Sequence, residues 1–242
     1  MVNRTTPGLD FKSFELKIQR QPNDETCGPT CLQAVYQYYD DELSLNDVIK
    51  QVKTLNTGGT LAVMLGNHAL SRGYEVTLFT YNLMMFDPTW FTNGVDLKEK
   101  LLEQRKHKQK KKFLQATDAY LKFIEAGGQI KFEELNVKLI RDILNKGIPI
   151  LTGLSATYLY NCAREIGEIN EYDDVKGTPA GHFVVIHGYD QLKKTAQIAD
   201  PLSENPLSDK QYYAVNLQRL INAILLGIVT YDANLLIIKN VS

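Results

Sequence analysis

Hydrophobic and polar positions follow two different periods in the first third of this chain. Residues 14–18 (FELKI) alternate with a period of two, which predicts a strand. After a polar turn, apolar residues recur at helical spacing and predict a helix over residues 26–39. Hydroxyl residues suited to N-caps open two further helical patterns, over residues 44–52 and about 60–72. The first third therefore reads as a helical lobe.

The middle of the chain is rich in basic residues and interrupts the apolar periodicity. Residues 98–112 hold eight Lys or Arg against two Glu, and apolar periodicity returns from Phe113 until Gly127 ends it. This pattern predicts one long helix, or two, over residues 96–126. Residues 82–126 look like a charged helical insertion.

The last third is rich in strands. Residues 182–188 (HFVVIHG) form a continuous apolar run typical of a buried strand. The other expected elements are strands at 74–80, 148–152, 195–199, 212–216 and 234–239, with helices at 136–145 and 217–226. Helices early and antiparallel strands late favour an α+β fold, and we expect a single domain over residues 1–242.

Composition narrows the classes of protein that remain. A net charge of −1 excludes a generally basic nucleic-acid binder. The apolar stretch at 220–231 is too short and too interrupted to cross a bilayer. Three cysteines, an odd number, do not make a disulfide framework, so a cytoplasmic protein is expected. The basic run at 98–112 is typical of a solvated helix face. The alternatives are a contact surface for an acidic partner or a lid beside a cleft.

Cys27 stands at the expected start of a helix. There the positive end of the helix dipole favours a thiolate. Gly28 leaves room for a substrate beside the sulfur, and the Cys27 N–H is one of the unpaired donors of the first turn. Gln21, six residues upstream, can turn back and place its amide beside the same point. The alternative is an ordinary capped helix with a buried cysteine. A metal site or redox pair with Cys31 has poor spacing.

His182 opens the buried strand directly after a glycine, a position from which a side chain can project into a cleft. If this strand and the next form a hairpin that turns at residues 191–194, Asp200 returns close to His182. Asp190 would lie about 26 Å away at the rise of a strand. The orienting acid of a His-based site would then be Asp200. His187, at odd spacing from His182, is expected on the opposite face.

Three blocks of the sequence together resemble the papain-like cysteine peptidases, in particular the bacteriocin-processing (double-glycine leader) peptidase group and its stand-alone relatives. The blocks are Gln-x5-Cys-Gly-Pro, then Gly-His-Phe-Val-Val-Ile-x-Gly-Tyr, then Asp-Pro, and they span residues 18–201. The resemblance implies a papain-like fold with the nucleophile helix packed on a C-terminal antiparallel sheet. It implies Cys27 as nucleophile, His182 as general base, Asp200 as its orienting group and Gln21 as an oxyanion donor.

The implied reaction is hydrolysis of an amide bond in a peptide or protein substrate through a thioester, with no cofactor or metal. The chain departs from the transporter-linked members, which carry membrane and ATPase parts, and this leaves the leader-peptide substrate open. Two other functions stay open: an acyltransferase or amidase acting on a non-protein substrate, and an inactive peptide-binding domain of the same fold.

Overall fold

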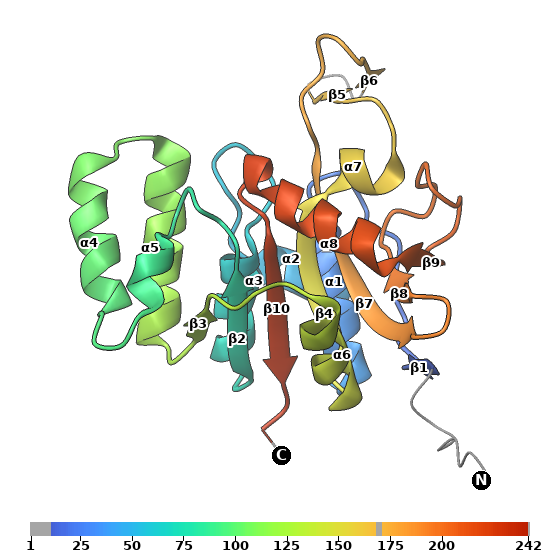
Figure 1. Ribbon diagram of the computed structural model, residues 1–242, viewed down its shortest axis with the longest axis horizontal. Helices are drawn as coiled ribbons and strands as arrows, with labels where there is room; N and C mark the ends of the chain where they lie inside the picture. Colours follow the sequence, from blue (N-terminus) through green and yellow to red (C-terminus); the bar gives the residue numbers. More distant parts are fainter. Residues whose placement is uncertain (1–10, 168–170, 242) are drawn as a thin grey trace, which may run out of the picture.

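The computed structural model describes residues 11–167 and 171–241, and an eight-stranded sheet forms its centre (Figure 1). Seven strands follow the order β3-β2-β10-β4-β7-β8-β9, and β1 pairs with β7. Neighbouring strands run antiparallel, except that β2 and β3 are parallel. A separate two-stranded ribbon is made by β5 and β6. The strands are β1 Phe11–Ser13, β2 Glu75–Thr80, β3 Gln129–Lys131, β4 Ile150–Ser155, β5 Glu165–Ile166, β6 Glu171–Tyr172, β7 Gly181–Asp190, β8 Thr195–Ala199, β9 Tyr212–Asn216 and β10 Asn234–Lys239.

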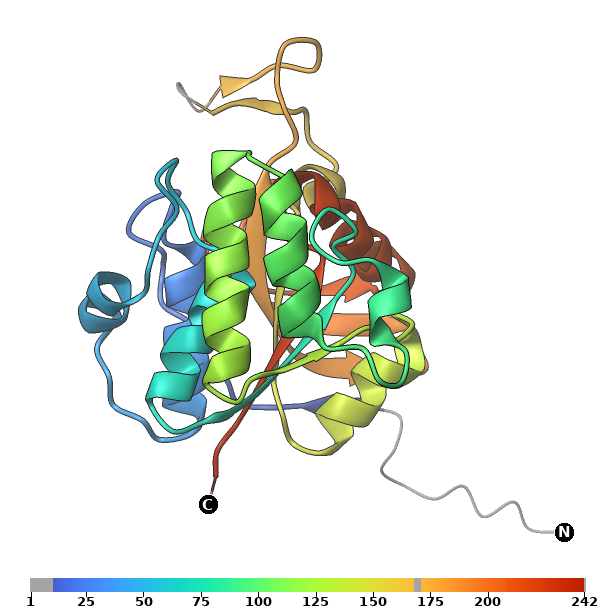
Figure 2. The ribbon, with the colours of Figure 1, turned by 90° about the vertical axis from the view of Figure 1, so that its left-hand side faces the viewer.

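Helices cover both faces of this sheet (Figures 1 and 2). The helices are α1 Cys27–Tyr38, α2 Leu45–Gln51, α3 Ala62–Ser71, α4 Leu97–His107, α5 Lys111–Glu125, α6 Val137–Asn145, α7 Ala156–Tyr160 and α8 Leu217–Leu226, with short 3-10 helices η1 Pro88–Phe91 and η2 Gly227–Thr230. One face packs against α1, α2, α3 and α5, and the other against α6, α7 and α8. The α+β class expected from the sequence is confirmed, with β1 and β3 as additional strands of the sheet.

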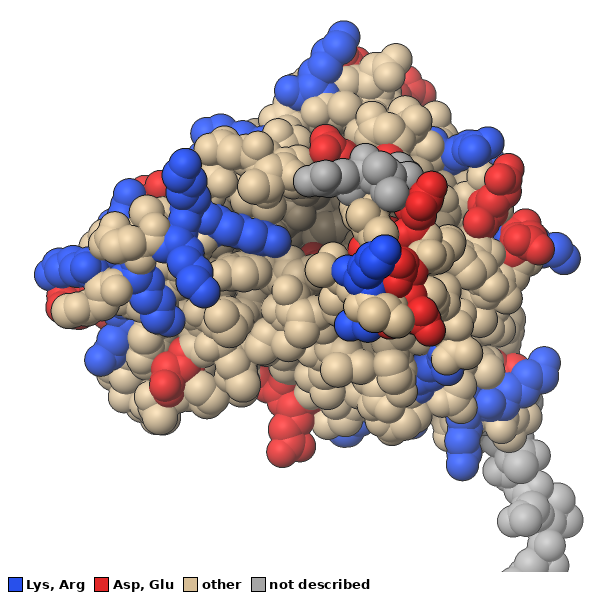
Figure 3. Space-filling view, turned by 90° about the horizontal axis from the view of Figure 1, so that it is seen from above, with Lys and Arg blue, Asp and Glu red and all other residues tan. Residues whose placement is uncertain are grey.

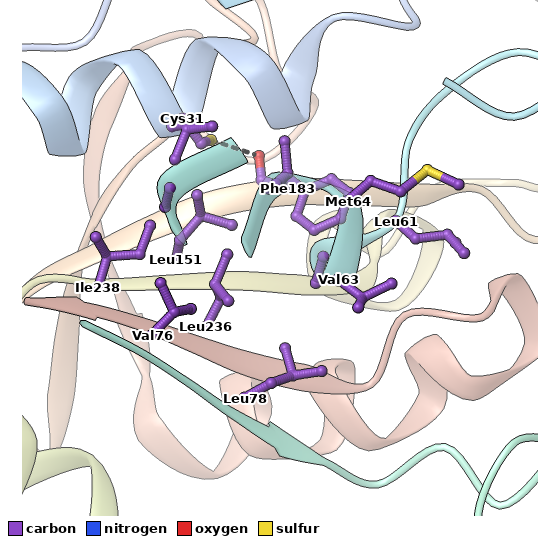
Figure 4. Close-up of a cluster of buried hydrophobic side chains, with 14 of the residues drawn as sticks. Cys31, Leu61, Val63, Met64, Val76, Leu78, Leu151, Phe183, Leu236 and Ile238 are labelled. Atoms are coloured by element: carbon purple, nitrogen blue, oxygen red, sulfur yellow. Dashed lines mark hydrogen bonds between the residues drawn. The ribbon is translucent and has the colours of Figure 1, made fainter. Parts of the chain in front are cut away.

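Two hydrophobic cores follow from this layering. Along β10, Leu236 and Ile238 face the core under α1 and α3, shown in Figure 4, whereas Leu235 and Ile237 face the core under α8. Successive side chains of a strand point to opposite faces, so a strand covered on both sides is apolar at every position. The same reason explains the continuous apolar run of β7.

The strand expected at residues 14–18 is wrong. The N-terminal strand is β1, which pairs with the end of β7, and Phe14 adds one more bond to the carbonyl of His187 at 2.8 Å. Beyond that point the chain leaves the sheet. Leu16 and Ile18 are still buried, which accounts for the alternation of apolar and polar residues in the sequence. Residues 14–18 cannot continue along β7, because both edges of that part of β7 are already paired, with β4 and β8. Alternating burial therefore arises here without a strand.

Residues 96–126 form two helices, α4 and α5, which is one of the two arrangements expected from the sequence. The amphipathic α5 buries Phe113, Tyr120 and Phe123 against the first core, whereas Leu101 is the one buried side chain of α4. The two helices are joined by ion pairs between Lys98 and Glu125 (2.9 Å) and between Arg105 and Asp118. That residues 82–126 are an insertion into one domain stays a prediction. None of the described helices is both long and apolar enough to cross a membrane.

Candidate active site

The sequence-predicted residues meet at one end of the sheet, where α1 and β7 begin and β8 ends. Cys27 is the first residue of α1, and the N-cap Thr26 places no side-chain hydrogen bond on the first turn. Gly28 lies so close to β7 that an added Cβ would stand 3.2 Å from Phe183 and 2.6 Å from Thr60. The glycine thus lets the start of the helix approach the strand that carries His182. Figure 3 looks onto this end of the sheet and shows a hollow in the surface.

His182 lies between a thiol and a carboxylate. Its Nε2 donates to Asp200 Oδ1 at 2.9 Å, and a hydrogen bond joins the ring to Cys27. Since Nε2 is taken by Asp200, Nδ1 is the ring nitrogen left for Cys27. Burial alone would lower the pKa of His182, but the Asp200 carboxylate, aided by Cys27, raises it above the ordinary value. The imidazole is therefore held ready to carry a proton.

Asp200 is fully buried and is anchored by four donors. Oδ1 accepts from His182 and from the Leu202 N–H at 2.9 Å, while Oδ2 accepts from the hydroxyls of Tyr160 (2.8 Å) and Tyr213 (2.7 Å). Burial acts to raise the pKa of Asp200, but its hydrogen bonds and the nearby His182 lower it below the ordinary value. The carboxylate is kept ionised and fixed in orientation.

The β7–β8 hairpin explains why Asp200, and not Asp190, reaches the histidine. Val185 pairs with Ala199 and Asp190 pairs with Thr195, so the turn lies at residues 191–194 as expected. Asp190 sits at the opposite end of the hairpin, where it accepts from the Lys193 N–H at 2.9 Å. A β-bulge at His187 interrupts the register, and His187 bonds to the Phe14 carbonyl, away from the site.

Gln21 lies in the turn before α1, beside the end of β8. Its backbone N–H donates to the Pro201 carbonyl at 3.0 Å, which ties this turn to the residue after Asp200. The side chain is 8% exposed, and among the described residues its buried Oε1 has no hydrogen-bond partner. Buried amides are normally satisfied, so this unpartnered acceptor is an exception.

The other two cysteines lie in different surroundings. Cys31, one turn along α1 from Cys27, is fully buried, and its thiol donates to the Phe183 carbonyl at 3.3 Å. Burial raises the pKa of both Cys31 and Cys162, so both favour the neutral thiol. Over residues 11–167 and 171–241, no group of three or more His, Cys, Asp or Glu side chains is arranged to hold a metal ion.

Sequence reasoning missed three residues of this site: Tyr160, Tyr213 and Asp232. The two tyrosines reach Asp200 from α7 and β9, and Asp232, in the loop before β10, interacts electrostatically with His182. They come from segments with no motif of their own. Contacts between distant segments bring in Tyr160 and Asp232, and the register of β9 on β8 brings in Tyr213, so no local motif marks them.

Comparisons with known proteins identify a family for this chain. A family model described as the Peptidase_C39 like family matches residues 13–223. A putative C39-like peptidase from Bacillus anthracis has 14% identity, covering 95% of this chain and 98% of its own, with a TM-score of 0.49. Xylellain, a cysteine protease from Xylella fastidiosa, has 12% identity, coverage of 96% and 87%, and a TM-score of 0.47.

A third solved structure is a double glycine motif protease from an AMS/PCAT transporter, in complex with the leader peptide. It has 15% identity, coverage of 94% of each chain, and a TM-score of 0.45. No curated protein matches the chain in sequence. The assignment of this chain to a family rests on the family model. The residues that it matches include Gln21, Cys27, His182 and Asp200 but not Asp232.

Proposed function

The chain belongs to the Peptidase_C39 like family and is a cysteine peptidase, and on this premise we propose that Cys27, His182 and Asp200 form its catalytic triad. The observation that carries the proposal is the hydrogen-bonded series from Cys27 through His182 to Asp200 at the start of α1. Nucleophile, base and orienting group stand in the order that thiol catalysis needs. We further infer from its three free cysteines that the enzyme works in a reducing cytoplasm.

The proposed reaction has two stages. In the first, the Cys27 sulfur attacks the carbonyl carbon of a peptide bond and its proton passes to His182. The imidazolium then donates that proton to the leaving amine as the carbon–nitrogen bond breaks, leaving a thioester on Cys27. In the second stage His182 takes a proton from water, the resulting hydroxide attacks the thioester, and the thiolate leaves with a carboxylic acid released.

The negative oxygen that forms during each attack needs donors. The N–H of Cys27, at the uncapped start of α1, is one candidate, and the amide N–H₂ of Gln21 is the second. The position of Gln21 in the turn directly before α1, fixed by its backbone bond to Pro201 after Asp200, supports this role.

The proposed substrate is a peptide or protein segment. The family and the triad both support amide-bond chemistry on a chain with an accessible carbonyl. Acyl transfer uses the same thioester and differs only in the group that captures it. Adding a primary amine during turnover and measuring the product mass separates the two reactions.

Labelling of the three thiols followed by intact mass tests the nucleophile. Near pH 6, where a free thiol with a pKa of about 8.5 is almost fully protonated, iodoacetamide is expected to label Cys27 first. Cys31 and Cys162 are protected by raised pKa values, and Cys31 also by full burial. His182→Ala should slow this labelling and abolish cleavage of a peptide library. Equal labelling rates at all three cysteines would remove Cys27 as the nucleophile.

A further inference from the structure

A second buried carboxyl group lies beside the histidine and takes no part in the proposed reaction. Asp232 is held against the first residue of β7 and against β4: a Cβ on Gly181 would overlap its Oδ2, and one on Gly153 would lie 2.8 Å from its Oδ1. Gly181 directly precedes His182, and the Asp232 carboxyl interacts electrostatically with that imidazole. Asp232 therefore borders the site from the side opposite to Asp200, since β4 and β8 flank β7 on different edges.

The backbone that presents Asp232 is strained. Its neighbours Tyr231 and Ala233 both have positive φ, 71° and 60°, although neither is glycine. Each such residue lowers stability, and strain of this kind persists where the surrounding structure enforces it. Here the Asp232 N–H donates to the Gly227 carbonyl at 3.0 Å, and the Asn82 amide donates to the Tyr231 carbonyl at 3.2 Å. The fold thus holds the Asp232 carboxyl group beside His182 at a cost in stability.

The carboxyl group has too few partners for a buried charge. Among the described residues, the Thr230 hydroxyl lies 2.6 Å from Oδ2, and that hydroxyl also lies 3.0 Å from the Gly227 carbonyl. A hydroxyl has a single proton, so it serves one of these acceptors at a time. Burial raises the pKa of Asp232 to about 7, against the opposing effects of Thr230, Lys112 and His182. An added cation would stabilise the ionised form.

The nearest basic side chain is engaged elsewhere. Lys112 donates from Nζ to the Thr230 carbonyl at 3.2 Å and lies 4.8 Å from the centre of the Tyr231 ring. Burial lowers the pKa of Lys112, so its own charge is also poorly solvated. No ion pair to Asp232 is found in the part of the chain that the structure describes. Lys112 thus lowers the pKa of Asp232 from nearby without forming an ion pair with it.

The surroundings of Asp232 favour a positive group. Asp232 retains 6% exposure, whereas Asp200 has none. Glu165, in β5, also interacts with His182, and both burial and Asp24 raise its pKa. Carboxyl groups thus stand on more than one side of the imidazole, and the proposed triad uses only Asp200.

We propose that Asp232 is a specificity residue of the cleft, which binds a cationic side chain, Lys or Arg, of the peptide substrate close to the bond that is cut. The proposal rests on the proposed function, because it places the peptide against Cys27 and His182. A lysine or arginine head group would supply the hydrogen bonds and the charge that Asp232 lacks. Asp232 lies outside the residues 13–223 matched by the family model, so the family assignment does not by itself imply this preference.

Peptidyl acyloxymethyl ketones provide the test, because the attacking thiol displaces their carboxylate and the rate reports recognition. Three series carry Lys, norleucine or Glu at the first, second or third residue before the reactive carbon. In the wild type we expect Lys to react about tenfold or more faster than norleucine at one of these positions, the scale of a charged hydrogen bond, and Glu to react most slowly. Asp232→Asn should bring the Lys and norleucine rates within about twofold of each other.

Matched controls separate this proposal from the triad. Each rate is divided by the iodoacetamide rate of the same variant, which cancels any change in Cys27 reactivity. Asp190→Asn, a buried acid at the far end of β7, should keep the full Lys preference. Asp232→Ser serves as the second variant if the asparagine protein does not fold. The absence of a Lys preference in the wild type, or its survival in the Asp232 variants, would overturn the proposal. Unselective iodoacetamide labelling would instead refute the triad.

Discussion

The hydroxyls of Tyr160 and Tyr213 both donate to the same oxygen of Asp200, at 2.8 and 2.7 Å. The other oxygen of this carboxylate faces His182. Two donors on Oδ2 prevent the carboxylate from rotating, so Oδ1 stays in line with the imidazole. The tyrosines therefore position the acid that positions the base.

We expect Tyr213→Phe to shift the acid limb of activity towards higher pH. The hydrogen bond from Tyr213 helps to lower the pKa of Asp200, so its loss raises that pKa. Activity that requires the ionised carboxylate is then lost earlier as pH falls. The kcat profile between pH 3 and 7 measures the shift. Tyr189→Phe, which loses a hydroxyl bonded to Asn145 at the far end of the hairpin, should leave the profile unchanged.

Asp200→Ala should lower turnover by about 10³–10⁴-fold, the scale of removing the orienting acid of a triad. Asp190→Ala should change turnover little, because the hairpin places Asp190 away from His182. Circular dichroism of both variants verifies the fold. The reverse order of effects would contradict the role assigned to Asp200.

Gln21→Ala should reduce turnover by about 10²–10³-fold, the usual loss for one oxyanion donor. Labelling of Cys27 by iodoacetamide should barely change, because the amide faces the substrate and not the thiol. Gln21→Glu should be at least as harmful, since a carboxylate repels the developing charge. Gln19→Ala is the matched control, because that side chain bonds to Gln33 instead. A folded and fully active Gln21→Ala enzyme would leave the Cys27 N–H as the only proposed donor.

The raised pKa of Asp232 predicts a pH dependence of the free energy of unfolding, which can be measured without an activity assay. Its pKa is raised to about 7, above the value of about 3.9 in the unfolded chain, so between these values the folded state binds more protons. The contribution of Asp232 to the free energy of unfolding therefore falls as pH rises, by about 3 kcal/mol from pH 4.5 to 7. Urea titrations of the wild type and Asp232→Asn at both pH values measure it. Equal pH dependence in the two proteins would contradict the raised pKa.

The sequence was sufficient for the parts of the site that depend on local structure. The position of Cys27 at a helix start identifies it as the candidate nucleophile. Asp200 is identified because a hairpin that turns at the polar residues 191–194 brings it back to His182. Tyr160 and Asp232 were not predictable, because they reach the site from segments far from Asp200 and His182 along the chain. Tyr213 lies only 13 residues from Asp200, but the sequence does not fix the register of β9 on β8 that brings its hydroxyl to the carboxylate. The expected strand at residues 14–18 failed for a related reason. A period of two reports alternating burial, whereas a strand also needs a free edge to pair with.

The hairpin described above also has a consequence for the order of assembly. His182 and Asp200 are 18 residues apart, whereas the contact that fixes α1 on β7, from Cys31 to Phe183, joins residues 152 positions apart. Local contacts close at a smaller entropic cost than distant ones. During refolding we expect amides of β7 and β8 to gain protection from hydrogen exchange before those of α1, and simultaneous protection would contradict this order. The imidazole–carboxylate pair would then exist before the thiol arrives, so a partly folded chain would be unable to cut its neighbours.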